Sequence, residues 1–248
     1  MSGIRLALIG AGGMAGTVHY PSFAEFDDVE LAGLCDLVES RRMELADRLS
    51  ISRTFADYTQ MLDETRPHAV CVFMPPHQLF DIVISCLNRG LHVFIEKPPG
   101  VSTYQTEAMA ALAEQKNCIT QVGFNRRFDP MLRQAIAAAA EHGGVIQAQA
   151  TFYKSAGAVY YDGAIDALRC DAIHAVDILR FIAGSEACRV AGLVGSYDST
   201  VPNAWNAVIE FENGVTGILQ TNWNTGGRYH GFEVHSRGYS ARVEQAES

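Results

Sequence analysis

Short apolar runs alternate with amphipathic stretches of helical length through the first 122 residues. Continuous apolar runs of this kind are typical of parallel strands that are buried on both faces. The predicted strands cover residues 4–9, 29–35, 69–74, 91–95 and 118–122. Helices are predicted between them, including one over residues 39–49 and one over residues 103–116. This alternation predicts an α/β domain over residues 1–122, with the doubly wound parallel sheet of a Rossmann fold.

The pattern changes after Gly123, where alternating strands become the commonest element. Helices are predicted over residues 130–141 and 168–183, with a long strand over residues 145–153 between them. Five further strands are predicted over residues 189–195, 204–211, 215–223, 231–236 and 239–243. Hairpin signals stand at Asn213-Gly214 and at Arg237-Gly238. Residues 123–248 are therefore predicted to form an α+β domain with a mainly antiparallel sheet.

Composition narrows the class of protein. The chain has 248 residues, of which 48% are hydrophobic, enough for a full globular core. Its net charge of -9 argues against nucleic acid and anionic membrane as partners. The six cysteines form no C-x-x-C pair, so reduced thiols are expected, and no metal-ligand spacing occurs. Without a cleavable signal or a membrane-length apolar run, a soluble cytoplasmic protein is expected.

The glycine-rich turn after the first strand fits the pattern G-x-G-x-x-G/A. It reads Gly10-Ala11-Gly12-Gly13-Met14-Ala15, and it follows a predicted strand and opens a helix, as dinucleotide binding requires. Gly10 permits the tight turn, Gly12 allows close approach of a pyrophosphate, and the small Ala15 lets helix pack on strand. The residues of this turn, Gly13 and Met14 included, are predicted to bind the cofactor phosphates at the helix N-terminus.

Asp36 ends the second strand, 21 residues after Ala15. A carboxylate at this point can accept hydrogen bonds from the adenosine ribose, and it repels a 2′-phosphate. NAD is therefore favoured over NADP, although Arg41 or Arg42 in the next helix can offset that repulsion. The alternative is a carboxylate that caps the helix beginning at residue 39.

Three further strand ends supply candidate residues at the same edge of the sheet. Met74 and Pro75 end the third strand and are predicted to line the nicotinamide or ribose. The fourth strand ends in Glu96-Lys97-Pro98, and a lysine held at such an edge can exchange protons with a ligand. Glu96 is predicted to bond a ribose hydroxyl or to pair with Lys97, and Lys97 is also predicted to contact the cofactor. The alternative for Lys97 is a solvated loop lysine.

The apolar helix predicted over residues 168–183 carries Asp171, His174 and Asp177 at intervals of three, so one side of a buried helix is expected to be polar. Buried charges are costly unless they are paired or used. We predict that His174 is catalytic and that Asp171 orients it. The alternative is a histidine that is satisfied within the core.

Other polar residues are candidates for ligand binding. Asn125 lies near the domain junction and is predicted to contact the cofactor, and Arg126 to contact cofactor or substrate. Packing salt bridges between the domains are an equal alternative for this segment. Lys154, Tyr161 and Arg169 flank a loop and can hydrogen-bond a hydroxylated substrate.

These features together resemble the Gfo/Idh/MocA oxidoreductases. The resemblance is carried by the glycine turn, Asp36, the Met74-Pro75-Pro76 and Glu96-Lys97-Pro98 edges, the segment over residues 121–130, and the helix from Asp171 to Asp177. It implies that NAD(P) serves to oxidise or reduce a carbinol of a sugar, inositol or related polyol, with the family lysine at Lys97 and its histidine at His174. It also implies an open antiparallel sheet through which a homodimer or homotetramer forms.

Three departures from the family pattern keep alternatives open. The family often has aspartate where Cys170 stands, and Asp171 is one residue later, about 100° around an α-helix. A histidine common after the third strand falls at Leu79, with His77 nearby, and the chain stops at Ser248, before the usual end of its relatives. The alternatives are an NAD-dependent glycoside hydrolase and a regulatory or scaffold protein that binds NAD without turnover.

Overall fold

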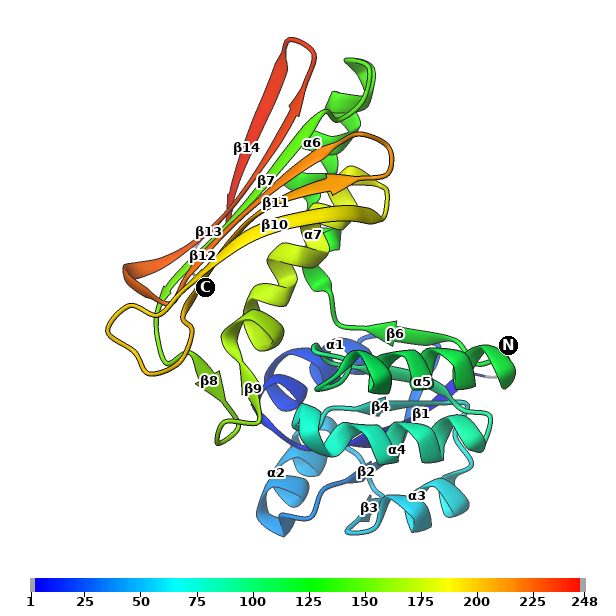
Figure 1. Ribbon diagram of the computed structural model, residues 1–248. Helices are drawn as coiled ribbons and strands as arrows, with labels where there is room; N and C mark the ends of the chain where they lie inside the picture. Colours follow the sequence, from blue (N-terminus) through cyan, green and yellow to red (C-terminus); the bar gives the residue numbers. More distant parts are fainter. Residues whose placement is uncertain (1–2, 246–248) are drawn as a thin grey trace. The chain divides into compact units, whose positions relative to one another are not determined.

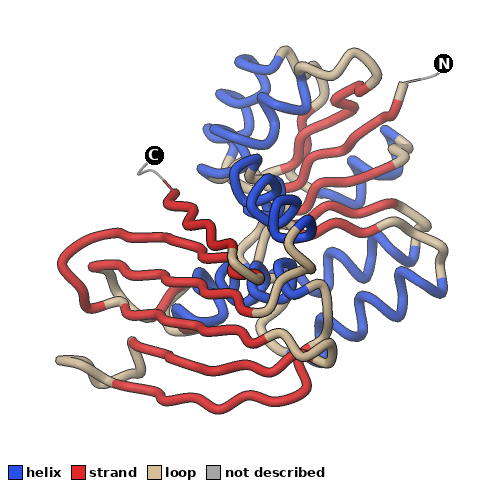
Figure 2. Tube along the Cα trace, turned by 90° about the horizontal axis from the view of Figure 1, so that it is seen from above, coloured by secondary structure: helices blue, strands red, loops and turns tan. Residues whose placement is uncertain are grey.

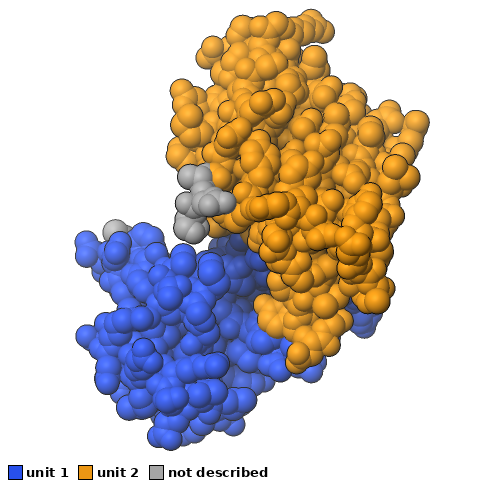
Figure 3. All heavy atoms as spheres, turned by 90° about the vertical axis from the view of Figure 1, so that its left-hand side faces the viewer, with its two compact units in different colours: residues 1–123 blue, residues 124–248 orange. Residues whose placement is uncertain are grey.

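The structure, a computed structural model, describes residues 3–245, and the chain divides after Gly123 into two compact units (Figure 3). The first two and last three residues of the predicted domains lie outside the described part. Each unit buries its own apolar core around its own six-stranded sheet. Among residues 3–245, no helix has the length and apolar character to cross a bilayer.

The sheet of the first unit has the order β3-β2-β1-β4-β5-β6, and all its neighbouring strands are parallel (Figure 1). The strands are β1 (Ile4–Ile9), β2 (Val29–Cys35), β3 (Thr54–Phe55), β4 (Ala69–Val72), β5 (His92–Ile95) and β6 (Thr120–Val122). The order reverses between β1 and β4, which pair directly. Doubly wound sheets bind ligands at the carboxyl ends of such strands, so this edge positions the candidate site.

The helical segments of the first unit follow the predicted alternation. They are η1 (Ala15–His19), α1 (Tyr20–Ala24), α2 (Glu39–Leu49), α3 (Tyr58–Thr65), α4 (Pro76–Asn88) and α5 (Thr103–Gln115). The sequence did not predict β3 or α3. A strand of two residues, such as β3, shows no periodicity. Asp57 starts α3 as its N-cap, since its carboxylate accepts a hydrogen bond from the Thr59 backbone N–H at 2.6 Å.

The second unit contains a six-stranded sheet in the order β10-β11-β12-β7-β13-β14, whose strands lie side by side (Figure 2). The strands are β7 (Gln147–Ser155), β10 (Ala187–Gly195), β11 (Ala204–Phe211), β12 (Thr216–Asn222), β13 (Asn224–Ser236) and β14 (Tyr239–Gln245). All pairs are antiparallel except β12 with β7, which is parallel. The mainly antiparallel sheet confirms the predicted fold class.

Helices cover one face of this sheet and leave the other open. The helical segments are η2 (Asn125–Phe128), α6 (Pro130–Glu141), η3 (Leu168–Ala172) and α7 (Ile173–Ala183), and a small hairpin, β8 (Val159–Tyr160) with β9 (Ile165–Asp166), precedes η3. Phe152 and Phe232 on the covered face are fully buried with Ile178 of α7. On the open face Leu193 and Val208 are 79% and 54% exposed.

The helix predicted over residues 168–183 differs from expectation in two ways. Its first five residues form the π-helical segment η3, so the rotation of about 100° per residue does not apply between Cys170 and Asp171. It is also not buried all round, since Val176 is 40% exposed while Ile178 and Leu179 are buried. Only its sheet-facing side therefore belongs to the core of the second unit.

Candidate dinucleotide and catalytic residues

The turn after β1 requires glycine at its first position. Gly10 has φ +96°, and a Cβ there would lie 2.3 Å from the backbone oxygen of Phe73. Beneath the turn, the buried Tyr20 hydroxyl donates a hydrogen bond to the Gly10 oxygen at 2.8 Å. The tight turn is thus fixed by its own backbone and by a tyrosine that the sequence did not single out.

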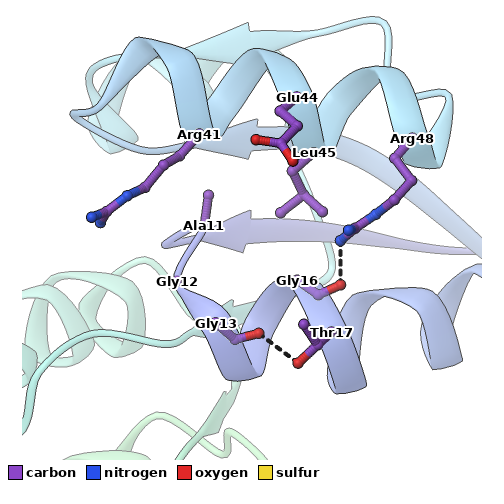
Figure 4. A pocket seen from close by; sticks show the side chains of 9 residues that line it. All are labelled: Ala11, Gly12, Gly13, Gly16, Thr17, Arg41, Glu44, Leu45 and Arg48. Atoms are coloured by element: carbon purple, nitrogen blue, oxygen red, sulfur yellow. Dashed lines mark hydrogen bonds between the residues drawn. The ribbon is translucent and has the colours of Figure 1, made fainter.

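The second part of the turn faces open space. A Cβ at Gly12 or at Gly13 would meet no atom within 4 Å, and both residues line a cavity of about 340 Å³ with Arg41 and Arg48 of α2 (Figure 4). Met14 is 53% exposed at the start of η1, whereas Ala15 is 2% exposed. A backbone cradle at a helix start, with no side chain to fill it, fits a pyrophosphate.

Asp36 lies in a second, larger cavity of about 670 Å³, which Gly10 and Gly12 also line. Its carboxylate accepts hydrogen bonds from the backbone N–H groups of Ala11 and Val38, both at 2.7 Å. These bonds hold the carboxylate between the glycine turn and the start of α2. A carboxylate has about four lone-pair positions, so two stay available for ribose hydroxyls.

The two arginines that follow Asp36 have different surroundings. Arg42 donates from Nη1 to the backbone oxygen of Asp36 at 2.7 Å, which anchors the end of β2. Arg41 lines both cavities, the smaller of which Figure 4 shows. Of the two, Arg41 is therefore the one that lines the candidate cofactor cavities.

The far wall of the larger cavity comes from the end of β4. Met74 and Pro75 line it, and β4 itself stops at Val72, before the strand end expected at residue 74. Cys35 lines the same cavity, and burial together with the Asp36 charge raises the pKa of its thiol to about 11. A neutral thiol is a poor nucleophile, so the cavity is suited to binding rather than to cysteine chemistry.

Glu96 pairs with a histidine that the sequence did not single out. Its Oε1 lies 2.6 Å from Nε2 of His19, and its Oε2 accepts a hydrogen bond from the Lys97 backbone N–H at 3.0 Å. His19 is surrounded by aromatic rings, with the ring centroid of Phe73 at 4.5 Å and that of Phe94 at 5.5 Å. Glu96 thus links an aromatic pocket to the backbone of the candidate lysine.

The two aspartates of the η3–α7 helix pair with basic residues from different elements. Asp171 forms an ion pair with Lys154 of β7, and Asp177 forms a two-pronged pair with Arg127 of η2. His174 is 6% exposed, and its ring stands edge-on to Phe124. Asp177 therefore clamps the start of the second unit to α7, while the orientation of His174 by Asp171 stays a prediction.

Arg126 lies against His230 of β13. Its Nη2 is 3.1 Å from Nδ1 of His230, and the guanidinium lies 5.2 Å from the ring centroid of Phe152. Lys154, another predicted substrate residue, lies near enough to lower the pKa of His230, although burial is the larger cause. Arg126 of η2 and Lys154 of β7, two of the predicted substrate residues, thus lie near His230 of β13.

The remaining candidates do not join that group. Arg169 pairs with Asp166, from Nη2 to Oδ2 at 2.7 Å, and its side chain is 58% exposed. Tyr161 follows β8 with φ +53° and is 46% exposed, and Asn125 is exposed at the start of η2. The ion pair with Asp166, three residues earlier, accounts for the position of the Arg169 side chain without a bound substrate.

Sequence comparison identifies the two halves of the chain separately. Residues 4–124 match the model of an "Oxidoreductase family, NAD-binding Rossmann fold", and residues 132–242 match a "GFO/IDH/MocA C-terminal domain". Myo-inositol 2-dehydrogenase of Thermotoga maritima is 24% identical over 240 residues, covering 87% of this chain and 67% of that protein. Rhizopine catabolism protein MocA of Rhizobium meliloti is 34% identical over 134 residues, covering 54% of this chain and 41% of the relative.

Solved structures share the fold over almost the whole chain. GenD2 from gentamicin A biosynthesis, in complex with NAD, has a TM-score of 0.86 at 24% identity, with 98% of this chain and 73% of that one covered. A dehydrogenase from Chromobacterium violaceum has a TM-score of 0.90 at 23% identity and the same coverage. The chain spans about two thirds or less of the length of the curated relatives named above. With both family models matched in order along it, the chain belongs to the Gfo/Idh/MocA family of NAD-binding oxidoreductases.

Proposed function

We propose that this protein is a dehydrogenase that transfers a hydride between NAD(H) and a secondary alcohol or carbonyl of a sugar, inositol or related polyol. The observation that carries the proposal is the cavity of about 670 Å³, in which Gly10, Gly12, Asp36 and Pro75 meet in an NAD-binding family. The named relatives include inositol and glucoside dehydrogenases, which supports a polyol substrate. When bound, the nicotinamide supplies the redox chemistry.

The chain's own residues supply binding and proton transfer. Gly12, Gly13, Met14 and Ala15 form the proposed cradle for the phosphates, and the Asp36 carboxylate accepts hydrogen bonds from ribose. Met74, Pro75, Glu96 and Asn125 are proposed to line the nicotinamide half of the cofactor. Asp36 favours NAD, because its charge repels a 2′-phosphate.

Lys97 and His174 are proposed to bind the reacting oxygen, one of them moving its proton. The Glu96 carboxylate supports this role, since it binds the Lys97 backbone N–H on one side and His19 on the other. Asp171 is proposed to act on His174 while it pairs with Lys154. Arg126, Lys154, Tyr161 and Arg169 are the proposed substrate residues, of which Arg126 and Lys154 are supported by their shared place near His230.

We also propose that residues 1–122 bind the cofactor and that residues 123–248 bind substrate and form a homodimer or homotetramer. The open face of the second sheet supports assembly, because Leu193 and Val208 are exposed there at adjoining strands. Buried thiols such as Cys71 and Cys86 support a reducing, cytoplasmic location.

The test is a panel of polyols, aldoses and sugar acids, each assayed for NADH or NADPH absorbance with both cofactors. The proposal expects at least one substrate that gives net reduced cofactor. Release of free sugar without net NADH would instead identify a glycoside hydrolase. Tight NAD binding with no turnover across the panel would identify a regulatory protein.

A further inference from the structure

Two arginines of the second unit share a single acceptor. Nη2 of Arg126 lies 3.1 Å and Nη2 of Arg228 lies 3.4 Å from the same atom, Nδ1 of His230. A guanidinium carries five N–H donors and no acceptor, whereas Nδ1 of a neutral imidazole has one lone pair. One nitrogen therefore cannot satisfy both groups, and within residues 3–245 neither guanidinium has a second hydrogen-bond acceptor.

The histidine between them is a neutral, buried ring. His230 is 1% exposed, and it stacks on Phe152 with 3.9 Å between ring centroids. Burial, and after it the charges of Arg126, Arg228 and Lys154, lower the pKa of His230 to about 3. Because Nδ1 accepts from the arginines, the ring proton belongs on Nε2. Neither Nε2 of His230 nor Nε of Arg126 has a hydrogen-bond partner within residues 3–245, though both are buried.

Acidic groups nearby are engaged elsewhere. The Asp171 carboxylate forms its ion pair with Lys154. The Asp129 carboxylate caps α6, accepting from the Met131 backbone N–H at 2.9 Å, and also accepts from Gln245 at 3.2 Å. In the described part of the chain, Arg126 and Arg228 have no ion-pair partner. The group consequently holds excess positive charge at a half-buried place, where a charge interacts more strongly than in water.

Resting on the function proposed above, we propose that Arg126 and Arg228 bind an anionic group of the substrate, so that this protein acts on an acidic sugar or polyol rather than a neutral one. The group is a carboxylate or a phosphate monoester, since the planar fork of a guanidinium matches both in two-pronged geometry. Lys154, held beside the pair by Asp171, adds positive charge to the same place.

Matched substrates test this inference directly. D-glucose, D-glucuronate and D-glucose 6-phosphate, with myo-inositol and myo-inositol 1-phosphate, are compared by calorimetric binding to the full chain with NAD and by NADH formation. We expect an acidic member to bind at least about tenfold more tightly than its neutral partner, with an advantage that shrinks as salt rises. The uronate and phosphate arms show which anion is used. Equal binding of acidic and neutral members would overturn the inference.

A charge-removing variant locates the effect. Arg228→Gln is expected to weaken binding of the acidic member about tenfold more than binding of the neutral one, with Arg228→Lys intermediate because it keeps charge but loses the fork. Arg180→Gln is the matched control, since Arg180 pairs with Glu186 and its side chain is 55% exposed. Equal loss for both members, or a loss confined to NAD affinity, would contradict the assignment. Circular dichroism checks that each variant is folded.

The results that would overturn the anion site differ from those that would overturn the dehydrogenase activity. Neutral polyols oxidised as well as acidic ones would keep the dehydrogenase and remove the anion site. Acidic sugars that bind through Arg228 but are never oxidised would keep the anion site and remove the dehydrogenase.

Discussion

The dinucleotide cavity of the first unit is shaped mainly by backbone, whereas the arginine pair of the second unit is built from side chains. Gly10 admits no Cβ, and Gly12 and Gly13 present bare main chain to the cavities that they line. In the second unit, by contrast, the guanidinium groups of Arg126 and Arg228 meet on one imidazole. Backbone donors recognise what all ligands of a fold have in common, and charged side chains select among ligands.

The two regions differ in how readily they accept substitutions. A cavity that is fixed by turn geometry resists substitution, because a side chain at Gly10 collides with Phe73. Arg228, by contrast, can be replaced without altering β13, since its contact with His230 is long, at 3.4 Å. In the proposed function, cofactor choice is thus built into the first unit, and substrate choice is open to change in the second.

The largest effect is expected from Lys97→Ala, which separates chemistry from cofactor binding in the first unit. Removing the ammonium takes away a proposed proton-transfer group, so turnover should fall about a hundredfold or more. The NAD dissociation constant should change little, because the cavity is held by backbone and by Asp36. Turnover is measured by NADH absorbance and binding by fluorescence titration. Full turnover in the variant would remove Lys97 from the mechanism.

Contacts between residues that are close in sequence could be predicted, whereas contacts between residues far apart in sequence could not. The alternation of strands and helices, the turn at Gly10 and the position of Asp36 follow from local spacing along the chain. The Arg169–Asp166 ion pair could also be predicted from the sequence, since it joins residues three positions apart. The His19–Glu96 contact spans 77 residues and the Arg126–His230 contact spans 104. Such pairings depend on strand order and register, which periodicity alone does not encode.

The next largest effect is expected on the stability of the first unit, where alanine substitutions at two glycines of the same turn are compared. Gly10→Ala places a Cβ 2.3 Å from a backbone oxygen at φ +96°, so the first unit should lose about 2–3 kcal/mol of stability. Gly12→Ala is the control, because its Cβ meets nothing within 4 Å, and it should fold normally but bind NAD more weakly. Thermal unfolding and NAD titration measure the two effects. Equal stability of both variants would contradict the backbone account of this turn.

A smaller effect is expected on the pH dependence of the stability of the second unit. The pKa of His230 is lowered to about 3 from an ordinary 6.5, so the unfolded chain binds a proton that the folded chain excludes. Stability from this group is complete above pH 6.5 and falls as pH drops toward 3. Between pH 6.5 and 5 the loss amounts to up to about 1.5 kcal/mol. His230→Gln, unfolded with denaturant at both pH values, should lack that loss. Parallel pH dependences would mean that the imidazole is protonated in the folded protein.

The smallest expected effect concerns Arg41 of the first unit. It tests whether a side chain there discriminates between NAD and NADP. Arg41 lines both cavities beside Asp36, while Arg42 is bound to backbone, so Arg41 is the group that can face a 2′-phosphate. Arg41→Ala should weaken NADP binding about fivefold and leave NAD binding within about twofold. Arg53→Ala removes the same charge at a guanidinium paired with Glu64, outside both cavities, and should change neither constant. If Arg41→Ala weakens NAD and NADP equally, the arginine serves the shared part of the cofactor, and the backbone alone does not account for cofactor binding.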